Sequence, residues 1–102
     1  MERVSFVMHI KEGCEAEYEK RHDEIWPELV ELISGTGVKN YSIFLHGLTL
    51  FAYLETEDPA AMEALKEDEL TWKWWRYMAP LMECNEDSSP KVEIIRQVFH
   101  MD

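Results

Sequence analysis

The chain has 102 residues, of which 46% are hydrophobic and 12% aromatic, so it can bury the core of one domain but not of two. Its 21 acidic and 10 basic residues give a formal net charge of −11. That charge disfavours nucleic acid and anionic membranes as partners and fits a neutral ligand better. We therefore expect a single domain over residues 1–102.

The cysteines and the N-terminal segment predict the cellular compartment. With only two cysteines, Cys14 and Cys84, reduced thiols are a better expectation than a disulfide framework. The N-terminal segment lacks the long apolar core of a signal peptide, and no apolar run approaches the roughly 18 residues of a membrane span. We expect a soluble, cytoplasmic protein with no membrane partner.

The first third of the chain predicts a strand followed by a broken helix. Alternating apolar residues over 3–10 indicate the strand, and residues 15–34 follow a helical period. The apolar stripe of that period consists of Tyr18, His22, Ile25, Leu29 and Leu32. Pro27 lies inside it, removes a backbone donor and crowds the preceding turn. We predict a kink, or one helix ending and another beginning near Trp26.

The middle of the chain predicts a hairpin and a short helix. Strands over 38–46 and 48–55 flank Gly47, which makes a tight turn between antiparallel strands. The Asp58-Pro59 pair then signals a helix start, because the aspartate can cap the helix and proline suits its first position. This helix is predicted over residues 59–66.

The last third predicts another helix, a polar loop and a final strand. The helix covers about residues 69–82, and its predicted stripe consists of Leu70, Trp74, Tyr77 and Leu81. The strand is predicted over residues 91–99. The order β-α-β-β-α-β is the ferredoxin-like pattern, an α+β fold with an antiparallel sheet and helices on one face.

The strands carry bulky apolar residues on both faces, which predicts association between copies of the chain. Phe51 and Tyr53 alternate with Leu50, and Phe99 alternates with Val98, so neither sheet face is polar. An exposed face that apolar is a liability in a monomer. We predict a homodimer in which the faces opposite the helices pack together.

His22 is the first candidate for chemistry. An imidazole with a pKa near ~6.5 can give and take protons at neutral pH. His22 lies on the buried stripe, with Tyr18 one turn away on the same helix face. The residues alone also allow a core histidine that simply bonds Tyr18 or a backbone carbonyl.

The tandem tryptophans are the second candidate. Neighbouring helical residues point about 100° apart, so Trp74 and Trp75 can line two walls of one cavity. Aromatic faces suit the C–H faces of a sugar, although plain core packing is equally open. Tyr41, inward on a strand, can offer a hydroxyl or serve only the core. No metal-ligand spacing and no phosphate-binding glycine loop is present, so no metal or nucleotide site is expected.

Three strings give the chain a family resemblance: YEKRHDEIWPEL from residue 18, NYSIFL from residue 40 and WKWWRYM from residue 72. In this order they resemble the L-rhamnose mutarotase family, and the likeness runs nearly end to end. The resemblance implies a dimeric α+β barrel that exchanges the α and β anomers of L-rhamnose, an isomerase reaction without a cofactor. It also implies that His22 transfers the proton and that the sugar is contacted by Tyr18, Tyr41, Trp74 and Trp75.

Three alternatives stay open at this point. The first keeps the reaction and changes the sugar to another 6-deoxy sugar such as L-fucose. The second is a dimeric ferredoxin-like binding or stress protein without catalysis. The third is a dimeric-barrel monooxygenase or haem-binding protein, in which His9 or His46 would be the iron ligand.

Overall fold

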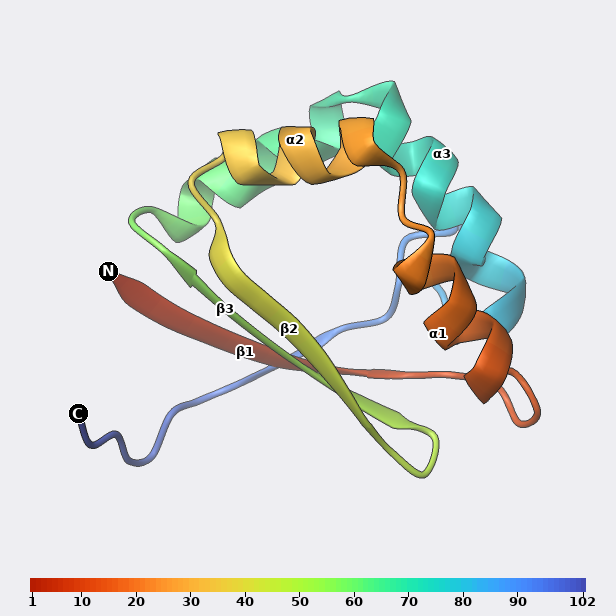
Figure 1. The fold of residues 1–102 in the computed structure, drawn as a ribbon, viewed down its shortest axis with the longest axis horizontal. Helices are drawn as coiled ribbons and strands as arrows, with labels where there is room; N and C mark the ends of the chain where they lie inside the picture. The colour runs from red at the N-terminus through yellow and green to blue at the C-terminus, as the bar shows by residue number, and fades with distance from the viewer.

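In a computed structural model that describes residues 1–102, the helices lie on one side of a single antiparallel sheet (Figure 1). The strands are β1 (Glu2–His9), β2 (Lys39–His46), β3 (Thr49–Thr56) and β4 (Glu93–Ile95). The helices are α1 (Glu15–Asp23), α2 (Pro27–Gly35) and α3 (Glu69–Met78), with 3₁₀ segments η1 (Pro59–Glu67) and η2 (Ala79–Leu81). No helix combines the length and the apolarity needed to cross a bilayer.

The strand order β2-β3-β1-β4 confirms the predicted ferredoxin-like α+β fold. β1 lies inside the sheet and pairs antiparallel with both β3 and β4. β2 and β3 form the predicted hairpin, and Gly47 makes its turn with φ of 62°, a left-handed value that glycine adopts without steric cost. The hairpin places β2 at the open edge of the sheet.

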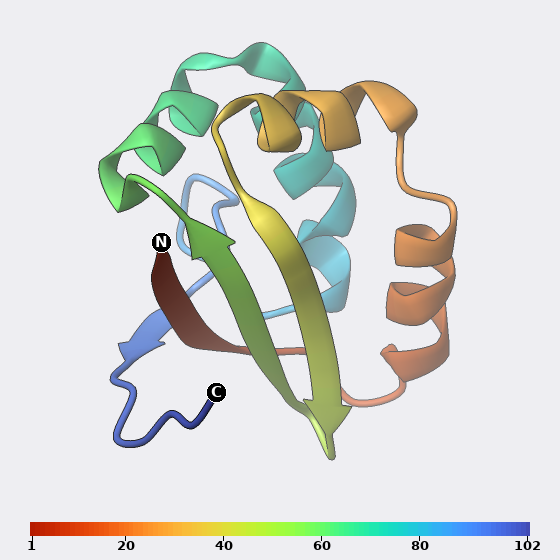
Figure 2. The same ribbon diagram turned by 60° about the vertical axis from the view of Figure 1, so that its left-hand side comes forward.

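The predicted break near Trp26 is confirmed, and Pro27 explains it. A residue before proline is pushed out of helical geometry, and Trp26 has an extended backbone with ψ of 126°. Proline then occupies the first position of α2, where no backbone donor is needed. The break lets α1 and α2 run in different directions over the sheet (Figure 2).

The core lies between the sheet and the helices. Along β3 the side chains alternate, and the inward set is fully or almost fully buried: Leu50, Ala52, Leu54 and Thr56. Leu50 and Ala52 share the core with buried residues of α3, including Trp74 and Met78. The opposite face of β3 carries Phe51, which is 39% exposed. The sheet therefore has one packed face and one open face.

The predicted helical segments differ in detail from the structure. Residues 59–67 form a 3₁₀ helix, started as expected by the Asp58 carboxylate, which accepts a hydrogen bond from the backbone of Ala60. The buried stripe of α3 runs through Thr71, Trp74 and Met78. Tyr77, which the sequence placed on the buried stripe, is 44% exposed. Its ring packs against the guanidinium of Arg21 from α1 at the surface.

The predicted strand over residues 91–99 is wrong beyond its centre. β4 pairs with β1 only opposite Ser5, Phe6 and Val7. After Ile95 the chain turns away from the sheet, as its blue C-terminal segment shows (Figure 2). Phe99 is 76% exposed there.

Candidate active site

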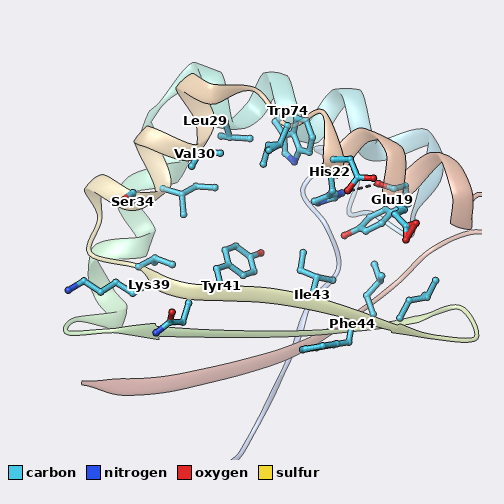
Figure 3. A pocket seen from close by; sticks show the side chains of 18 of the residues that line it. Glu19, His22, Leu29, Val30, Ser34, Lys39, Tyr41, Ile43, Phe44 and Trp74 are labelled. Carbon is cyan, nitrogen blue, oxygen red and sulfur yellow. Dashed lines mark hydrogen bonds between the residues drawn. The ribbon is translucent and has the colours of Figure 1, made fainter.

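A hollow between the helices and the inner face of the sheet has two connected parts. The wide chamber, of about 1180 Å³, is lined mainly by α1, α2 and β2, and the narrow chamber, of about 360 Å³, by β1, η1 and α3. Four of the five residues predicted for the site line both chambers: Tyr18, His22, Tyr41 and Trp74. The fifth, Trp75, lines the narrow chamber alone. All five thus line the narrow chamber, and Figure 3 shows His22, Tyr41 and Trp74 around the wide one.

The imidazole of His22 is held in one orientation by Tyr18. Its Nδ1 lies 3.0 Å from the backbone carbonyl oxygen of Tyr18, and a carbonyl can only accept, so Nδ1 donates the hydrogen. The two rings stack with centroids 4.4 Å apart, and the edge of Trp74 meets the imidazole at 5.5 Å. In the neutral ring the lone pair therefore stays on Nε2.

The surroundings of His22 favour its neutral form. Burial lowers the pKa of the imidazole below its usual value of 6.5, and this effect outweighs the Tyr18 carbonyl and the Asp23 carboxylate, which favour the charged form. At neutral pH the ring is therefore unprotonated at Nε2. A neutral imidazole with a fixed tautomer is a base ready to accept a proton.

Tyr41 reaches the hollow from the inner face of β2. Ile43 pairs with the buried Ala52, and strand alternation places Tyr41 on the same face as Ile43. The ladder between β2 and β3 is interrupted between Lys39 and Ser42, and Asn40 adopts a left-handed φ of 51°. Tyr41 is 40% exposed, and that surface lines the two chambers (Figure 3).

Both tyrosines of the hollow are neutral hydrogen-bond donors. Burial raises the pKa of Tyr41 to about 12. Burial also raises the pKa of Tyr18, helped by repulsion from Tyr41 if both were ionised. Two phenols that stay protonated at neutral pH can each donate to an oxygen of a bound molecule.

The two tryptophans form different walls. Trp74 is 8% exposed, stands edge-on to Trp26 with ring centroids 5.0 Å apart, and directs its indole nitrogen into the hollow (Figure 3). Trp75 stands edge-on to Trp72 at 4.8 Å and faces only the narrow chamber. The two tryptophans thus give the hollow aromatic surface at two places, and the Trp74 N–H lies where the two chambers meet.

Sequence reasoning missed a contact that joins α1 to α3, between Arg21 and Tyr77. The guanidinium of Arg21 lies 4.1 Å from the centre of the Tyr77 ring and donates to the Tyr77 carbonyl, while its Nε donates to Glu17 at 2.8 Å. The Glu17–Arg21 spacing is visible in the sequence as a helical ion pair. The contact with Tyr77 joins residues 56 positions apart, so no local pattern predicts it.

The other histidines lie away from the hollow. His9 and His46 both stand opposite Thr49 in the register, on the sheet face that points away from the helices. Neither lines a chamber. No cluster of three or more His, Cys, Asp or Glu side chains is arranged to hold a metal ion. His9 and His46, the iron ligands of the third alternative, thus lie outside the hollow.

The chain is similar in fold to two solved structures of known proteins. A solved L-rhamnose mutarotase from Formosa agariphila matches it at 38% identity and TM-score 0.92, each chain fully covered. A dimeric ferredoxin-like protein from an uncultured marine organism matches at 15% identity, with 98% and 94% of the chains covered and TM-score 0.62, a likeness of fold alone.

The sequence comparisons agree with that structural match. The L-rhamnose mutarotase of Listeria monocytogenes is 47% identical over 103 residues, which cover 99% of both chains. The family model described as L-rhamnose mutarotase matches residues 3–101. With nearly the whole length matched in both sequence and structure, the chain belongs to the L-rhamnose mutarotase family.

Proposed function

We propose that this protein interconverts the α and β anomers of L-rhamnose by acid/base opening and reclosure of the hemiacetal. The observation that carries the proposal is the free Nε2 of a neutral His22 inside a hollow with room for a monosaccharide. Family membership supports the same sugar, since the relatives are named for it. The reaction class is isomerase.

The reaction consists of proton transfers at two oxygen atoms. His22 Nε2 takes the proton of the anomeric hydroxyl, the bond from C1 to the ring oxygen breaks, and the ring oxygen gains a proton. Both oxygens are attached to C1, so the same Nε2 can take the proton from the anomeric hydroxyl and then deliver it to the ring oxygen. Rotation about C1–C2 in the neutral open-chain aldehyde exposes its other face, and the steps reverse. Positioned groups of this kind typically give ~10²–10⁴-fold acceleration.

The remaining side chains bind and orient the sugar. Tyr18 and Tyr41 donate hydrogen bonds to sugar oxygens as neutral phenols. Trp74 and Trp75 pack against C–H faces of the pyranose. None of these steps consumes or regenerates a cofactor, because electrons and atoms balance within the sugar and the imidazole.

The active protein is a homodimer that works in the cytoplasm, as part of the same proposal. Across the open sheet face, Phe44 stands opposite Phe51, and Phe51 opposite Val7, in one apolar row. Phe44 is 65% exposed in the single chain, and covering it with a second copy would remove that apolar surface from water. Both cysteines are free thiols, which suits a reducing compartment.

The proposal is tested by anomer exchange. Freshly dissolved pure α-L-rhamnose is followed by NMR with purified wild type, His22→Ala and the control His100→Ala, which removes an exposed histidine paired with Asp102. We expect acceleration by wild type and His100→Ala, and a loss of at least about 100-fold for His22→Ala. Full activity of His22→Ala would overturn the role of His22.

The choice of sugar is tested with a panel of L-rhamnose, L-fucose and L-mannose under the same conditions. We expect the largest acceleration with L-rhamnose. A preference for L-fucose would keep the reaction and replace the substrate. No acceleration with any of the three sugars would overturn the enzymatic function and leave a binding protein.

A further inference from the structure

The narrow chamber contains one polar atom that the fold leaves without a partner. Thr71 is 4% exposed, and its hydroxyl is the single buried side-chain oxygen or nitrogen that makes no hydrogen bond within the chain. Thr71 also lines the narrow chamber, beside Trp74 and Trp75 on the same helix. A buried hydroxyl without a partner is costly, so folding alone does not account for it.

The hydroxyl of Thr71 does not make the backbone bond that a helical threonine commonly makes. Such a hydroxyl can bond a carbonyl three or four residues earlier, as that of Thr36 does with the Ile33 carbonyl at 2.6 Å. The Asp68 carbonyl accepts the backbone N–H of Thr71, but the Thr71 hydroxyl bonds neither this carbonyl nor that of Glu67. The surrounding chamber walls are mainly apolar and offer it no other partner within the chain.

A second buried threonine shows what a satisfied hydroxyl looks like in this protein. Thr56 is fully buried, and its hydroxyl both donates to the Asp58 carbonyl and accepts from the Asp58 backbone, each at 3.3 Å. It lines neither chamber. Thr56 is thus a matched reference: the same residue type and the same burial, with partners and away from the hollow.

We propose that the hydroxyl of Thr71 binds a ring hydroxyl of the sugar and makes Thr71 a specificity-determining residue, an inference that rests on the proposed mutarotase function. Threonine in a helix has two accessible χ1 rotamers, so a rotation about Cα–Cβ presents the hydroxyl to the chamber. Thr71 precedes Trp74 by three residues and so lies on the same helix face. The sugar would then be held by Tyr41 from the sheet side and by Thr71 and the Trp74 N–H from α3.

The first test compares Thr71→Val, Thr71→Ser and Thr56→Val by kinetics and thermal unfolding. Valine keeps the shape of threonine and removes the hydroxyl. We expect Thr71→Val to raise KM about three- to tenfold at unchanged kcat, with a Tm no lower than wild type, because no bond within the fold is lost. Thr71→Ser should bring KM back to within about twofold of wild type. Thr56→Val should lower Tm and leave KM unchanged.

The second test identifies the sugar hydroxyl. KM is measured for L-rhamnose analogues lacking the hydroxyl at C2, C3 or C4, with wild type and Thr71→Val. The analogue that lacks the hydroxyl bound by Thr71 should have the same KM with both proteins, because it cannot form the hydrogen bond that Thr71→Val removes. An equal rise of KM for all three analogues would overturn the hydrogen bond.

The remaining outcomes separate the two hypotheses. If wild type accelerates exchange and Thr71→Val has the wild-type KM, the inference on Thr71 fails and the mutarotase function stands. A Tm loss in Thr71→Val as large as in Thr56→Val would also overturn it, since the hydroxyl would then have a structural partner. If wild type gives no acceleration, the proposed function fails and the inference fails with it.

Discussion

The role proposed for His22 depends on which nitrogen of its imidazole carries the hydrogen. The Tyr18 carbonyl takes the Nδ1 hydrogen of His22, one helical turn earlier, and so fixes the tautomer from inside the same helix. The stacked Tyr18 ring and the edge of Trp74 limit rotation of the imidazole. A base built in this way does not need a carboxylate partner to orient it.

The lowered pKa of His22 predicts an acidic limb in the pH profile. The neutral ring is the proposed active form, so kcat/KM, which reports the pKa values of the free enzyme, should fall as pH decreases through the pKa of His22. That pKa lies below its usual value of 6.5 because burial disfavours the charged ring. The measurement is kcat/KM between pH 4.5 and 8, with the spontaneous exchange rate subtracted at each pH. A limb centred above pH 7 would contradict the assignment.

Tyr41→Phe should weaken sugar binding without moving that limb. The variant loses one neutral donor, and we expect KM to rise about three- to tenfold. Because the pKa of Tyr41 is raised to about 12, its ionisation does not shape the wild-type profile near neutral pH. The matched control is Tyr53→Phe, whose hydroxyl donates to Glu55 at 2.7 Å outside the hollow. Equal KM values for both variants would contradict a role for Tyr41.

At the scale of elements, the site depends on how α1 is held beside α3. Arg21, next to His22 in the chain, packs its guanidinium on Tyr77 of α3 and bonds the backbone there. His22 and Trp74 meet across the same two helices, with ring centroids 5.5 Å apart. Since Arg21 lines neither chamber, we propose that it positions the imidazole without touching the sugar.

Arg21→Ala should therefore reduce both stability and turnover. The loss of a cation–π contact and a hydrogen bond is expected to cost about 1–3 kcal/mol of unfolding free energy. The control is Arg76→Ala, which removes an exposed ion pair with Glu69 and should change little. Urea unfolding and anomer exchange are measured for both. If Arg21→Ala resembles Arg76→Ala in kcat, Arg21 does not position the imidazole.

Local signals predicted the elements whose causes are local. Pro27 predicts the break between α1 and α2, and the alternation of side chains along β3 predicts which face of that strand is buried. The spacing of Tyr18 and His22 predicts their shared helix face, which the structure confirms. These signals act within about one helical turn or along one strand, and reading them needs no tertiary information.

Other features depend on contacts between distant segments, and the sequence could not supply them. The buried stripe of α3 passes through Thr71 and Met78, while Tyr77 lies at the surface in contact with Arg21, and no local pattern predicts that contact. The interruption of the ladder between Lys39 and Ser42 depends on pairing between β2 and β3. The family resemblance predicted the candidate site residues. The tautomer of His22 follows only from the contact between its Nδ1 and the Tyr18 carbonyl, which the sequence does not show.

At the scale of the whole molecule, the two faces of the sheet differ. Its inner face closes the hollow, and its outer face exposes Phe44 and Phe51, the surface that we propose meets a second copy. The C-terminal segment adds exposed Val98 and Phe99 next to β1. Apolar surface on this scale is a common mark of association in a protein of this size.

Phe44→Glu should produce monomers. A charge in the centre of an apolar interface is left unpaired and desolvated, so association is disfavoured. The control is Ala64→Glu, which adds the same charge to an exposed position on η1 at the helical side. Light scattering after gel filtration should give twice the chain mass for wild type and Ala64→Glu. A wild-type mass equal to one chain would contradict the homodimer.

The hollow draws every one of its five candidate side chains from a single polypeptide, through α1, β2 and α3. Each subunit of the proposed homodimer would then bind and convert its own sugar, and none of these five side chains would come from the partner subunit. Hybrid pairs that combine an intact chain with one lacking the imidazole would keep half the turnover. Mixing two differently disabled chains would restore none of it.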